Sequence, residues 1–571
     1  MHPPRSLYAA LLISLTFIPN AQSQQKPDAA TAAWWAQTTA LSNDSMEGRD
    51  TGTEAYDRAA KYVADQFQSA GLKPAGDNGT FFQRVPMHQV ELIAEKSSIE
   101  ILPDDGKPIP LQLLQQITVT PRDQMPEALT APMVFIGDGA NDLDVRDKIV
   151  VFFNYISSSI QGRPRDTFAP RRQQALIKAG AAAVISIDNP SAIEPFHWPA
   201  SYARTVSLER PPVVEDIPSP PVPLSLRISA DAASALFTNS GHSFSEILTL
   251  AGKDKTLPSF PLNASLRLRL TKEIKEISSP NILAILPGFD PKLAPEYVAL
   301  SAHLDGYGYG TPVLGDNLYN GTLDDAAYVA LLIELAKNLS HDGRFSYQKQ
   351  LKHELKADPC AGRWQGEKPE PCSTTASAPT LDKAPARSLL FCIFTGEEKG
   401  LLGSAYFTQH LTVPKENIVA NLNLDQLRPI FPLNILTMEG LNDSTLGETV
   451  QTVASQFKIE IRPDLEPERN LFRRADNYNF VRIGVPIASF IFGYDKDSPE
   501  ELIYRDWYAR RYHKPQDDIK TPIDWDAAAK FNRFYTALTL TIANASARPQ
   551  WLPSSPYSPH PPNSLHQNPA Q

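Results

Sequence analysis

Residues 389–400 have the sequence LLFCIFTGEEKG, and this stretch contains the pattern that decides the fold. Its first six residues, 389–394, are a continuous apolar run with the length and composition typical of a strand buried on both faces. The run ends at Thr395-Gly396, two acidic residues follow at once, and Gly400 begins a predicted helix over 400–410. A strand followed by a polar loop and a helix is the repeating unit of α/β proteins.

The same unit recurs on both sides of this stretch. Further strands are predicted at 282–285, 297–302, 418–424 and 487–491, and further helices at 325–339, 445–456 and 525–543. Strands that alternate with helices are joined by crossovers, which favour parallel pairing. We therefore predict an α/β fold whose central sheet is mostly parallel and is flanked by helices on both faces.

The chain has 571 residues, which is too long for one compact core. Ahead of the central sheet, a helix is predicted at 53–71. Strands at 133–136, 149–153 and 183–187, with a helix at 172–179, indicate a separate α/β unit. The predicted domains are as follows: a smaller inserted domain over 117–252, a main domain over 24–116 and 253–547, a surface excursion at 340–387, and a disordered tail at 548–571.

The first residues are typical of a secretory signal. Arg5 precedes an apolar run over 7–18, and Ala21-Gln22-Ser23 places small residues at a cleavage site. We expect a signal peptide over 1–23 and a secreted or periplasmic protein. Because no later run approaches about 20 apolar residues, we expect no stable membrane insertion after cleavage.

Charge and cysteine content exclude some partners and sites. The formal net charge of −10 argues against a nucleic-acid partner, which needs a basic surface. Only three cysteines occur. Cys392 lies in an apolar run and is expected to be buried, whereas Cys360 and Cys372 lie close enough in sequence to form a disulfide, a question the sequence leaves open. None has the spacing of a thiolate metal site.

Polar residues gather where the predicted strands end. These residues are His303 and Asp305 after 297–302, Asp324 before the helix at 325–339, Glu397 and Glu398 after 389–394, Asp425 after 418–424, and His513 in the polar loop before the last helix. In open α/β sheets, ligands and catalytic groups collect at the carboxyl ends of the strands.

Imidazoles and carboxylates together suit zinc. Five such ligands exceed one tetrahedral site but serve two ions if one carboxylate is shared, and three carboxylates offset the repulsion between two cations. Each residue alone has a structural explanation: Asp324 is in a position for a helix cap, and adjacent acids often form a solvated turn. Their joint occurrence, in order, favours a metal site.

The motifs at these positions resemble those of the co-catalytic dizinc aminopeptidases, a group that includes glutamate carboxypeptidase II, glutaminyl cyclases and the transferrin receptor ectodomain. The motifs are HLD at 303–305, GTLDDA at 321–326, GEE at 396–398, LD at 424–425 and YH at 512–513. Segments 46–52, 473–476 and 484–486 are also similar to that group. The block at 117–252 resembles the protease-associated (PA) domain of many secreted members.

The resemblance implies a zinc exopeptidase fold of the phosphorylase/hydrolase-like type with two zinc ions. Asp324 would bridge the ions, with His303 and Asp425 on one and Glu398 and His513 on the other. Glu397 would be the general base, and the Asp305 carboxylate would fix the tautomer of His303. Three positions depart from the family pattern and leave the substrate preference open: Tyr328, Ala475 and Asn477.

The implied function is that of an aminopeptidase that hydrolyses N-terminal bonds of peptides or proteins with a metal-bridging hydroxide. Two alternatives stay open on the same scaffold: an inactive binding module and a one-zinc glutaminyl cyclase. All five ligands and Glu397 are present, which counts against both. The His-Glu-x-x-His motif of single-zinc proteases is absent, because Ala357 occupies the position of the second histidine after His353-Glu354. The Gly-x-Ser-x-Gly motif of serine hydrolases is also absent. Carboxypeptidase or dipeptidase action, the oligomeric state and the role of the PA-like domain are not decided by the sequence.

Overall fold

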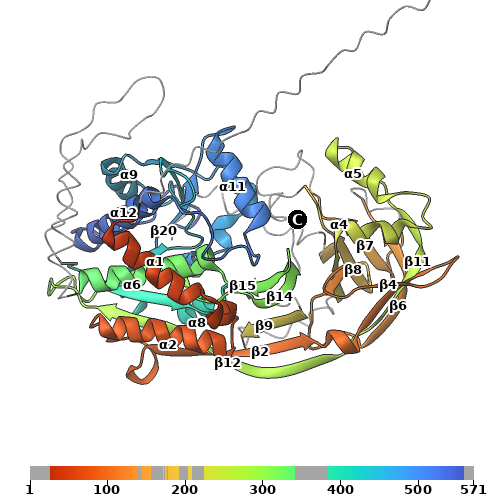
Figure 1. Ribbon diagram of the computed structural model, residues 1–571, viewed down its shortest axis with the longest axis horizontal. Helices are drawn as coiled ribbons and strands as arrows, with labels where there is room; N and C mark the ends of the chain where they lie inside the picture. Colours follow the sequence, from red (N-terminus) through yellow and green to blue (C-terminus); the bar gives the residue numbers. More distant parts are fainter. Residues whose placement is uncertain are drawn as a thin grey trace, which may run out of the picture.

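Two β-sheets organise the protein, and each forms one of the two lobes seen in Figure 1. The computed structural model describes residues 26–137, 143–155, 172, 174–176, 178–191, 203–208, 224–340 and 384–558. The larger lobe contains the central sheet, and the smaller lobe contains the second sheet. The long strands β2 (Phe82–Leu92) and β12 (Lys272–Leu286) run side by side from one lobe to the other.

The central sheet has the order β19-β18-β20-β17-β13-β16-β12-β2-β9, and β1 pairs with β12. Its other strands are β1 (Lys73–Pro74), β9 (Arg204–Leu208), β13 (Tyr297–His303), β16 (Ser388–Phe394), β17 (Ile418–Asn423), β18 (Ile435–Glu439), β19 (Glu460–Arg462) and β20 (Ile487–Gly493). The parallel strands predicted from the sequence are present, since β16, β13, β17 and β20 are parallel neighbours.

The prediction of a mostly parallel sheet is nevertheless wrong for the sheet as a whole. β12 pairs antiparallel with both β16 and β2, and β18 pairs antiparallel with β20. The chain leaves the central sheet along β2, builds the second lobe and returns along β12. Outgoing and returning strands that lie side by side must run in opposite directions, so the sheet is mixed.

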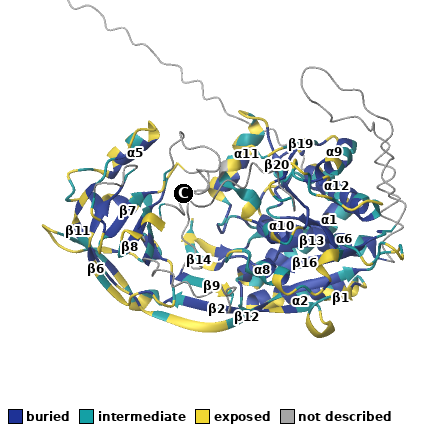
Figure 2. Ribbon diagram, turned by 180° about the vertical axis from the view of Figure 1, so that it is seen from behind, coloured by how far each residue is buried: buried dark blue, intermediate teal, exposed yellow. Residues whose placement is uncertain are grey.

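Helices cover both faces of the central sheet, as predicted. One face carries α1 (Ala29–Ser42), α2 (Glu54–Ser69), α6 (Ala327–Leu339), α9 (Leu446–Gln456), α11 (Pro499–Arg510) and α12 (Trp525–Asn544). The other face carries α8 (Leu402–Gln409) and α10 (Asn477–Arg482). β16 supplies alternate side chains to the two faces, with Phe391 on the first and the buried Cys392 on the second. Figure 2 shows β13 and β16 as dark blue, buried strands.

The second sheet has the order β4-β3-β11-β6-β7-β8-β10-β5. Its strands are β3 (Ser98–Pro103), β4 (Ile109–Leu111), β5 (Ile117–Val119), β6 (Ala128–Phe135), β7 (Ile149–Phe153), β8 (Ala183–Ile187), β10 (Leu224–Ile228) and β11 (Phe260–Arg269). The short α4 (Ala230–Ala233) and α5 (Phe244–Gly252) pack on it. This lobe extends beyond the predicted 117–252, because β3, β4 and β11 complete its sheet, whereas β9 pairs with β2 in the central sheet.

Residues 548–558, the first part of the tail predicted to be disordered, belong to the described structure. The indole Nε1 of Trp551 donates to the Gly484 carbonyl over 2.9 Å, and Trp551 and Tyr557 pack on the core. The predicted signal peptide, Cys360, Cys372 and most of the 340–387 excursion lie outside the described residues, as does part of the helix predicted at 172–179. Within the described residues, no helix has both the length and the apolar character needed to cross a membrane.

Candidate metal centre

The predicted ligands meet at one edge of the central sheet. His303 is the last residue of β13, Glu397 and Glu398 follow β16, and Asp425 follows β17. Because these three strands are parallel neighbours, their carboxyl ends lie at the same edge. Asp324 lies in the helical turn Thr322–Ala326 that leads into α6, and its peptide bond to Asp325 is cis. His513 follows α11 in a turn where its φ is 55°.

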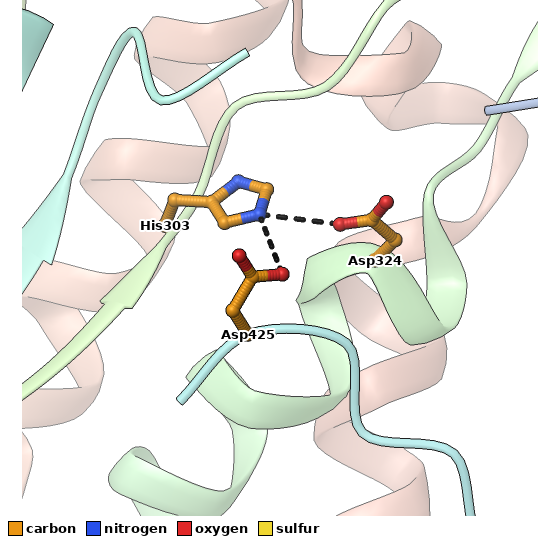
Figure 3. A group of neighbouring side chains, drawn as sticks. All are labelled: His303, Asp324 and Asp425. Carbon is orange, nitrogen blue, oxygen red and sulfur yellow. Dashed lines mark hydrogen bonds and ion pairs between the residues drawn. The ribbon is translucent and has the colours of Figure 1, made fainter. Parts of the chain in front are cut away.

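Asp324 lies between the two histidines. Its Oδ1 is 3.2 Å from Nε2 of His303, and its Oδ2 is 3.3 Å from Nε2 of His513. Asp425 Oδ1 lies 3.9 Å from the same nitrogen of His303, and the two contacts of that nitrogen are drawn in Figure 3. Glu398 Oε2 lies 3.5 Å from Nε2 of His513. One carboxylate thus faces two imidazoles, each with a further carboxylate beside it.

The donor atoms form two overlapping groups, each compact enough to surround one cation. Within each group all donor atoms lie within 4.8 Å of one another. The first group contains His303, Asp324 and Asp425, and the second contains Asp324, Glu398 and His513. Asp324 belongs to both groups, which is the arrangement that a bridging carboxylate requires. Glu397 forms a third group with His303 and Glu398.

The electrostatics of these groups fit divalent cations. Asp324 Oδ2 and Asp425 Oδ1 are buried, and neither has a hydrogen-bond partner of good geometry among the described residues. Burial raises the pKa of Glu398 to about 7 and that of Asp425 to about 6, so these carboxylates lack compensating positive charge. Buried carboxylates are stable when they are paired or bind a metal. The donor set is that of zinc, which accepts imidazole and carboxylate ligands.

The pKa values of His303 and Asp324 are shifted in opposite directions. Burial alone would lower the pKa of His303, but its contact with Asp324 raises this pKa well above the usual range. Burial alone would raise the pKa of Asp324, but the contacts with His303 and His513 lower it.

The role predicted for Asp305 stays a prediction, and both its carboxylate and its carbonyl lie near His303. The Asp305 carboxylate lies 3.8 Å from Nδ1 of His303, whereas the backbone carbonyl of Asp305 lies 3.1 Å from that nitrogen. The carbonyl is the nearer of the two groups to this nitrogen. The carboxylate instead accepts hydrogen bonds from the backbone N–H groups of Glu397 and Glu398, over 3.0 and 3.3 Å. It holds the loop that follows β16.

Two buried residues hold the turn that contains Asp324. The Asp517 carboxylate accepts the backbone N–H of Leu323 over 3.0 Å and that of Asp324 over 3.1 Å. The Arg49 guanidinium donates to the carbonyls of Leu304 and Gly321, over 2.7 and 2.8 Å, so it ties the end of β13 to the same turn. Arg49 lies in the segment 46–52 that resembles the dizinc family, and Asp517 follows the YH motif by four residues, but the sequence assigned neither a role.

Tyr307 is a contact of the site that the sequence did not indicate. Its hydroxyl donates to Glu398 Oε2 over 2.5 Å and lies 3.0 Å from Nδ1 of His513. Its ring lies 4.7 Å from that of His513. Tyr307 follows the HLD motif by two residues, but nothing in its spacing predicted that it would reach His513, 206 residues away.

A cavity of about 570 Å³ opens beside the candidate metal centre. It is lined by Asp324, Glu397, Glu398, Asp425 and His513 on one side. Other lining residues include Glu439, Arg473, Arg474 and Arg227, and the last of these comes from β10 of the second lobe. A polar donor cluster that opens into a cavity of this size can bind a small substrate. Fold and site together fit a divalent-metal centre at the edge of an α/β sheet, beside a cavity.

Comparisons with known proteins specify the class further. Residues 281–539 match the model of peptidase family M28. The structure is similar to an aminopeptidase from Aneurinibacillus sp. strain AM-1, with a TM-score of 0.53, 16% identity, and coverage of 89% of this chain and 92% of that chain. It is also similar to BSAP, a zinc aminopeptidase from Bacillus subtilis, with a TM-score of 0.52, 16% identity, and coverage of 90% and 95%. No curated protein matches the chain.

The similarity to peptidase family M28 lies in residues 281–539. The match spans β12 to α12 and so includes every candidate ligand. The two solved structures share the fold over most of their length, including the second lobe. The matched family is one of peptidases, and one of the two similar structures is named as a zinc aminopeptidase.

Proposed function

We propose that this protein is a secreted aminopeptidase that holds two zinc ions and removes residues from the N-termini of peptides. The observation that supports it most directly is the position of Asp324, whose two oxygens face His303 and His513. Asp425 and Glu398 complete the two donor groups. When bound there, zinc would polarise the scissile carbonyl and lower the pKa of the attacking water.

Glu397 is the proposed general base. It borders the cavity and lies beside the donor atoms of His303 and Glu398, while its backbone is fixed by Asp305. Its carboxylate takes a proton from the attacking water and delivers it to the nitrogen of the breaking peptide bond. The carboxyl product and the free amine then leave, so one water is consumed for each bond broken.

The choice of the N-terminal end of the substrate is supported by the family resemblance and by the two similar structures, both of which are aminopeptidases. The test is a panel of aminoacyl-amide substrates, their N-acetyl forms, and peptides with a free C-terminus only, assayed with the zinc-loaded chain. We expect turnover of the free-amine substrates alone, and its loss with a chelator. Equal turnover of N-acetyl substrates, or turnover that a chelator leaves unchanged, would contradict the proposal.

Export belongs to the same proposal, because residues 5–23 have the pattern of a cleaved signal. Amino-terminal sequencing of the protein recovered outside the cytoplasm should begin near Gln24. Recovery of an uncleaved chain in the cytoplasm alone would contradict export and would leave the peptidase assay unaffected.

A further inference from the structure

Glu439 is a buried carboxylate in the cavity wall that the proposed mechanism does not use. It is the last residue of β18, it is only 6% exposed, and it borders the cavity that contains the metal-site residues. Its Oε1 is buried and has no hydrogen-bond partner among the described residues. An unpartnered buried carboxylate is costly, so its retention in a cavity wall points to a ligand that completes it.

The sheet register gives the position of Glu439 relative to the metal centre. Asn423 on β17 lies beside Ser489 on β20, which lies beside Glu439 on β18. Neighbouring strands are about 4.8 Å apart, so Glu439 lies about 10 Å across the sheet from the strand that precedes Asp425. Ser489 also borders the cavity, between these two strands. A substrate side chain that extends along this wall from the metal centre would end at Glu439.

A basic side chain has the length to extend over more than half of this span. The charged group of lysine or arginine lies about 6 Å from its Cα on an apolar stem, and the Cα is adjacent to the scissile carbonyl. A leucine side chain held in the same way would stop well short of Glu439. A basic side chain is therefore the kind that can approach the carboxylate, with its stem along Ser489 and Ile491, which border the same cavity.

The arginines that border the cavity contact other groups and do not neutralise the charge of Glu439. Arg474 Nη2 lies 3.4 Å from the Tyr512 hydroxyl, Arg473 lies 5.7 Å from the centre of the Tyr478 ring, and Arg227 pairs with Asp188. Both Arg473 and Arg474 are exposed, whereas Glu439 is buried. Asp464 adds further negative potential near Glu439, opposed by Arg469. The buried end of the cavity thus favours a cation.

We propose that Glu439 forms the end of the pocket that receives the side chain of the substrate's N-terminal residue, and that it selects arginine or lysine there. This inference rests on the proposed aminopeptidase function. Selection would come from a charge-assisted hydrogen bond in a site that is withdrawn from water, where such bonds are strongest. Glu439 would act as a specificity residue and take no part in bond cleavage.

The test compares arginine with its neutral isostere citrulline, each as an N-terminal aminoacyl-amide, on the zinc-loaded full chain. We expect kcat/KM to be about 10- to 100-fold higher for arginine, as charge-assisted hydrogen bonds imply. In Glu439→Gln this ratio should fall to within about threefold of one. Glu460→Gln is the matched control: it removes a carboxylate from the adjacent β19, where Glu460 pairs with Arg462, and should keep the wild-type ratio.

An equal rate for arginine and citrulline in the wild-type protein would overturn the inference, and this comparison does not depend on whether the variant folds. An unchanged ratio in folded Glu439→Gln would also overturn it. Calorimetric titration of the full chain with L-arginine and L-citrulline separates this inference from the proposed function. If no substrate is hydrolysed but arginine binds at least about tenfold tighter than citrulline, and Glu439→Gln removes the difference, the pocket assignment holds while the peptidase proposal fails.

Discussion

The backbone N–H of Glu397 donates a hydrogen bond to the carboxylate of Asp305 over 3.0 Å. The second oxygen of that carboxylate accepts the backbone N–H of Glu398 and the hydroxyl of Thr51. Asp305 is fully buried, and burial raises its pKa, so the contacts that it accepts are what stabilise its ionised form there. One side chain therefore fixes the main chain of both the proposed base and a proposed zinc ligand.

Asp305→Asn should lower kcat/KM and zinc affinity, each by about 10- to 100-fold, as expected for residues that orient metal ligands. The amide nitrogen cannot accept a hydrogen bond, so one of the two N–H groups loses its partner and the loop shifts. Steady-state kinetics and zinc competition with a chelator measure the two effects. Thr51→Val removes only one neutral contact of the same carboxylate and should change either quantity by less than about fivefold. Equal effects of the two variants would contradict this role of Asp305.

Zinc stoichiometry distinguishes a bridging Asp324 from a ligand of one ion. Asp324 belongs to both donor groups, whereas Asp425 belongs to one of them. Asp324→Ala should therefore lose both ions, and Asp425→Ala should keep the ion held by Glu398 and His513. Elemental analysis after dialysis against buffered zinc gives the count for each folded variant. One retained ion in Asp324→Ala would show that this carboxylate does not serve both positions.

Glu397→Gln should separate catalysis from metal binding. Glutamine cannot accept a proton, so turnover should fall by about 10²- to 10⁴-fold, the usual contribution of a general base. Zinc content should stay at the wild-type value, because the five proposed ligands are intact. Glu398→Gln, the adjacent substitution, should instead lose zinc as well as activity. Near-normal turnover in Glu397→Gln would assign proton transfer to another group.

The central strands and the edge that holds the ligands were predictable because their signals are local. The apolar run 389–394 corresponds to β16, Ser388–Phe394, and the run 297–302 to β13, Tyr297–His303. Strands buried on both faces have continuous apolar sequences, and the polar residue that follows marks the carboxyl end. His303, Glu398 and Asp425 could therefore be placed together without any knowledge of distances.

Other elements depended on packing that the sequence does not show. α11 was missed because its surface is largely polar, although Ser498-Pro499-Glu500-Glu501 is a helix-start signal and the Ser498 side chain does cap the Glu501 N–H. β18 has only five residues and is recognisable mainly through its pairing with β20. Glu439 could not be linked to the metal centre before that register was known.

The separate contacts of the Asp305 carbonyl and carboxylate could not be predicted, for a different reason. The sequence HLD correctly indicated that position 305 contacts His303, but side-chain and backbone oxygens of one residue are equivalent in a sequence pattern. The structure gives the contact to the carbonyl, at 3.1 Å, and leaves the carboxylate for the loop after β16. That choice depends on the path of the chain between β13 and β14 (Gly308–Val313), which no local pattern specifies.

The preference for arginine should depend on pH through Glu439. Burial first, and then Asp464, raise the pKa of Glu439 to about 8, against the opposing effect of Arg469. Below that pH the free protein holds Glu439 protonated and neutral, and above it the carboxylate is ionised. Because arginine remains charged throughout, the ratio of kcat/KM for arginine to that for citrulline should rise from pH 6.5 and level off above about 8.

The same titration has an effect on stability with a defined sign. Since the folded-state pKa of Glu439 lies above its usual 4.5, the folded protein binds this proton more tightly than the unfolded chain does. The contribution to stability is therefore complete at low pH and is lost as pH rises through about 8. Glu439→Gln removes the titration, so at pH 9 it should be more stable than wild type, by on the order of 1–3 kcal/mol, the cost of an unsatisfied buried group.

The Glu439→Gln variant also tests the pH dependence of substrate preference. Its arginine-to-citrulline ratio of kcat/KM should not vary with pH, because both substrates share the same α-amine. A wild-type ratio that stays flat from pH 6.5 to 9, or a variant ratio that still rises, would show that another group sets the preference.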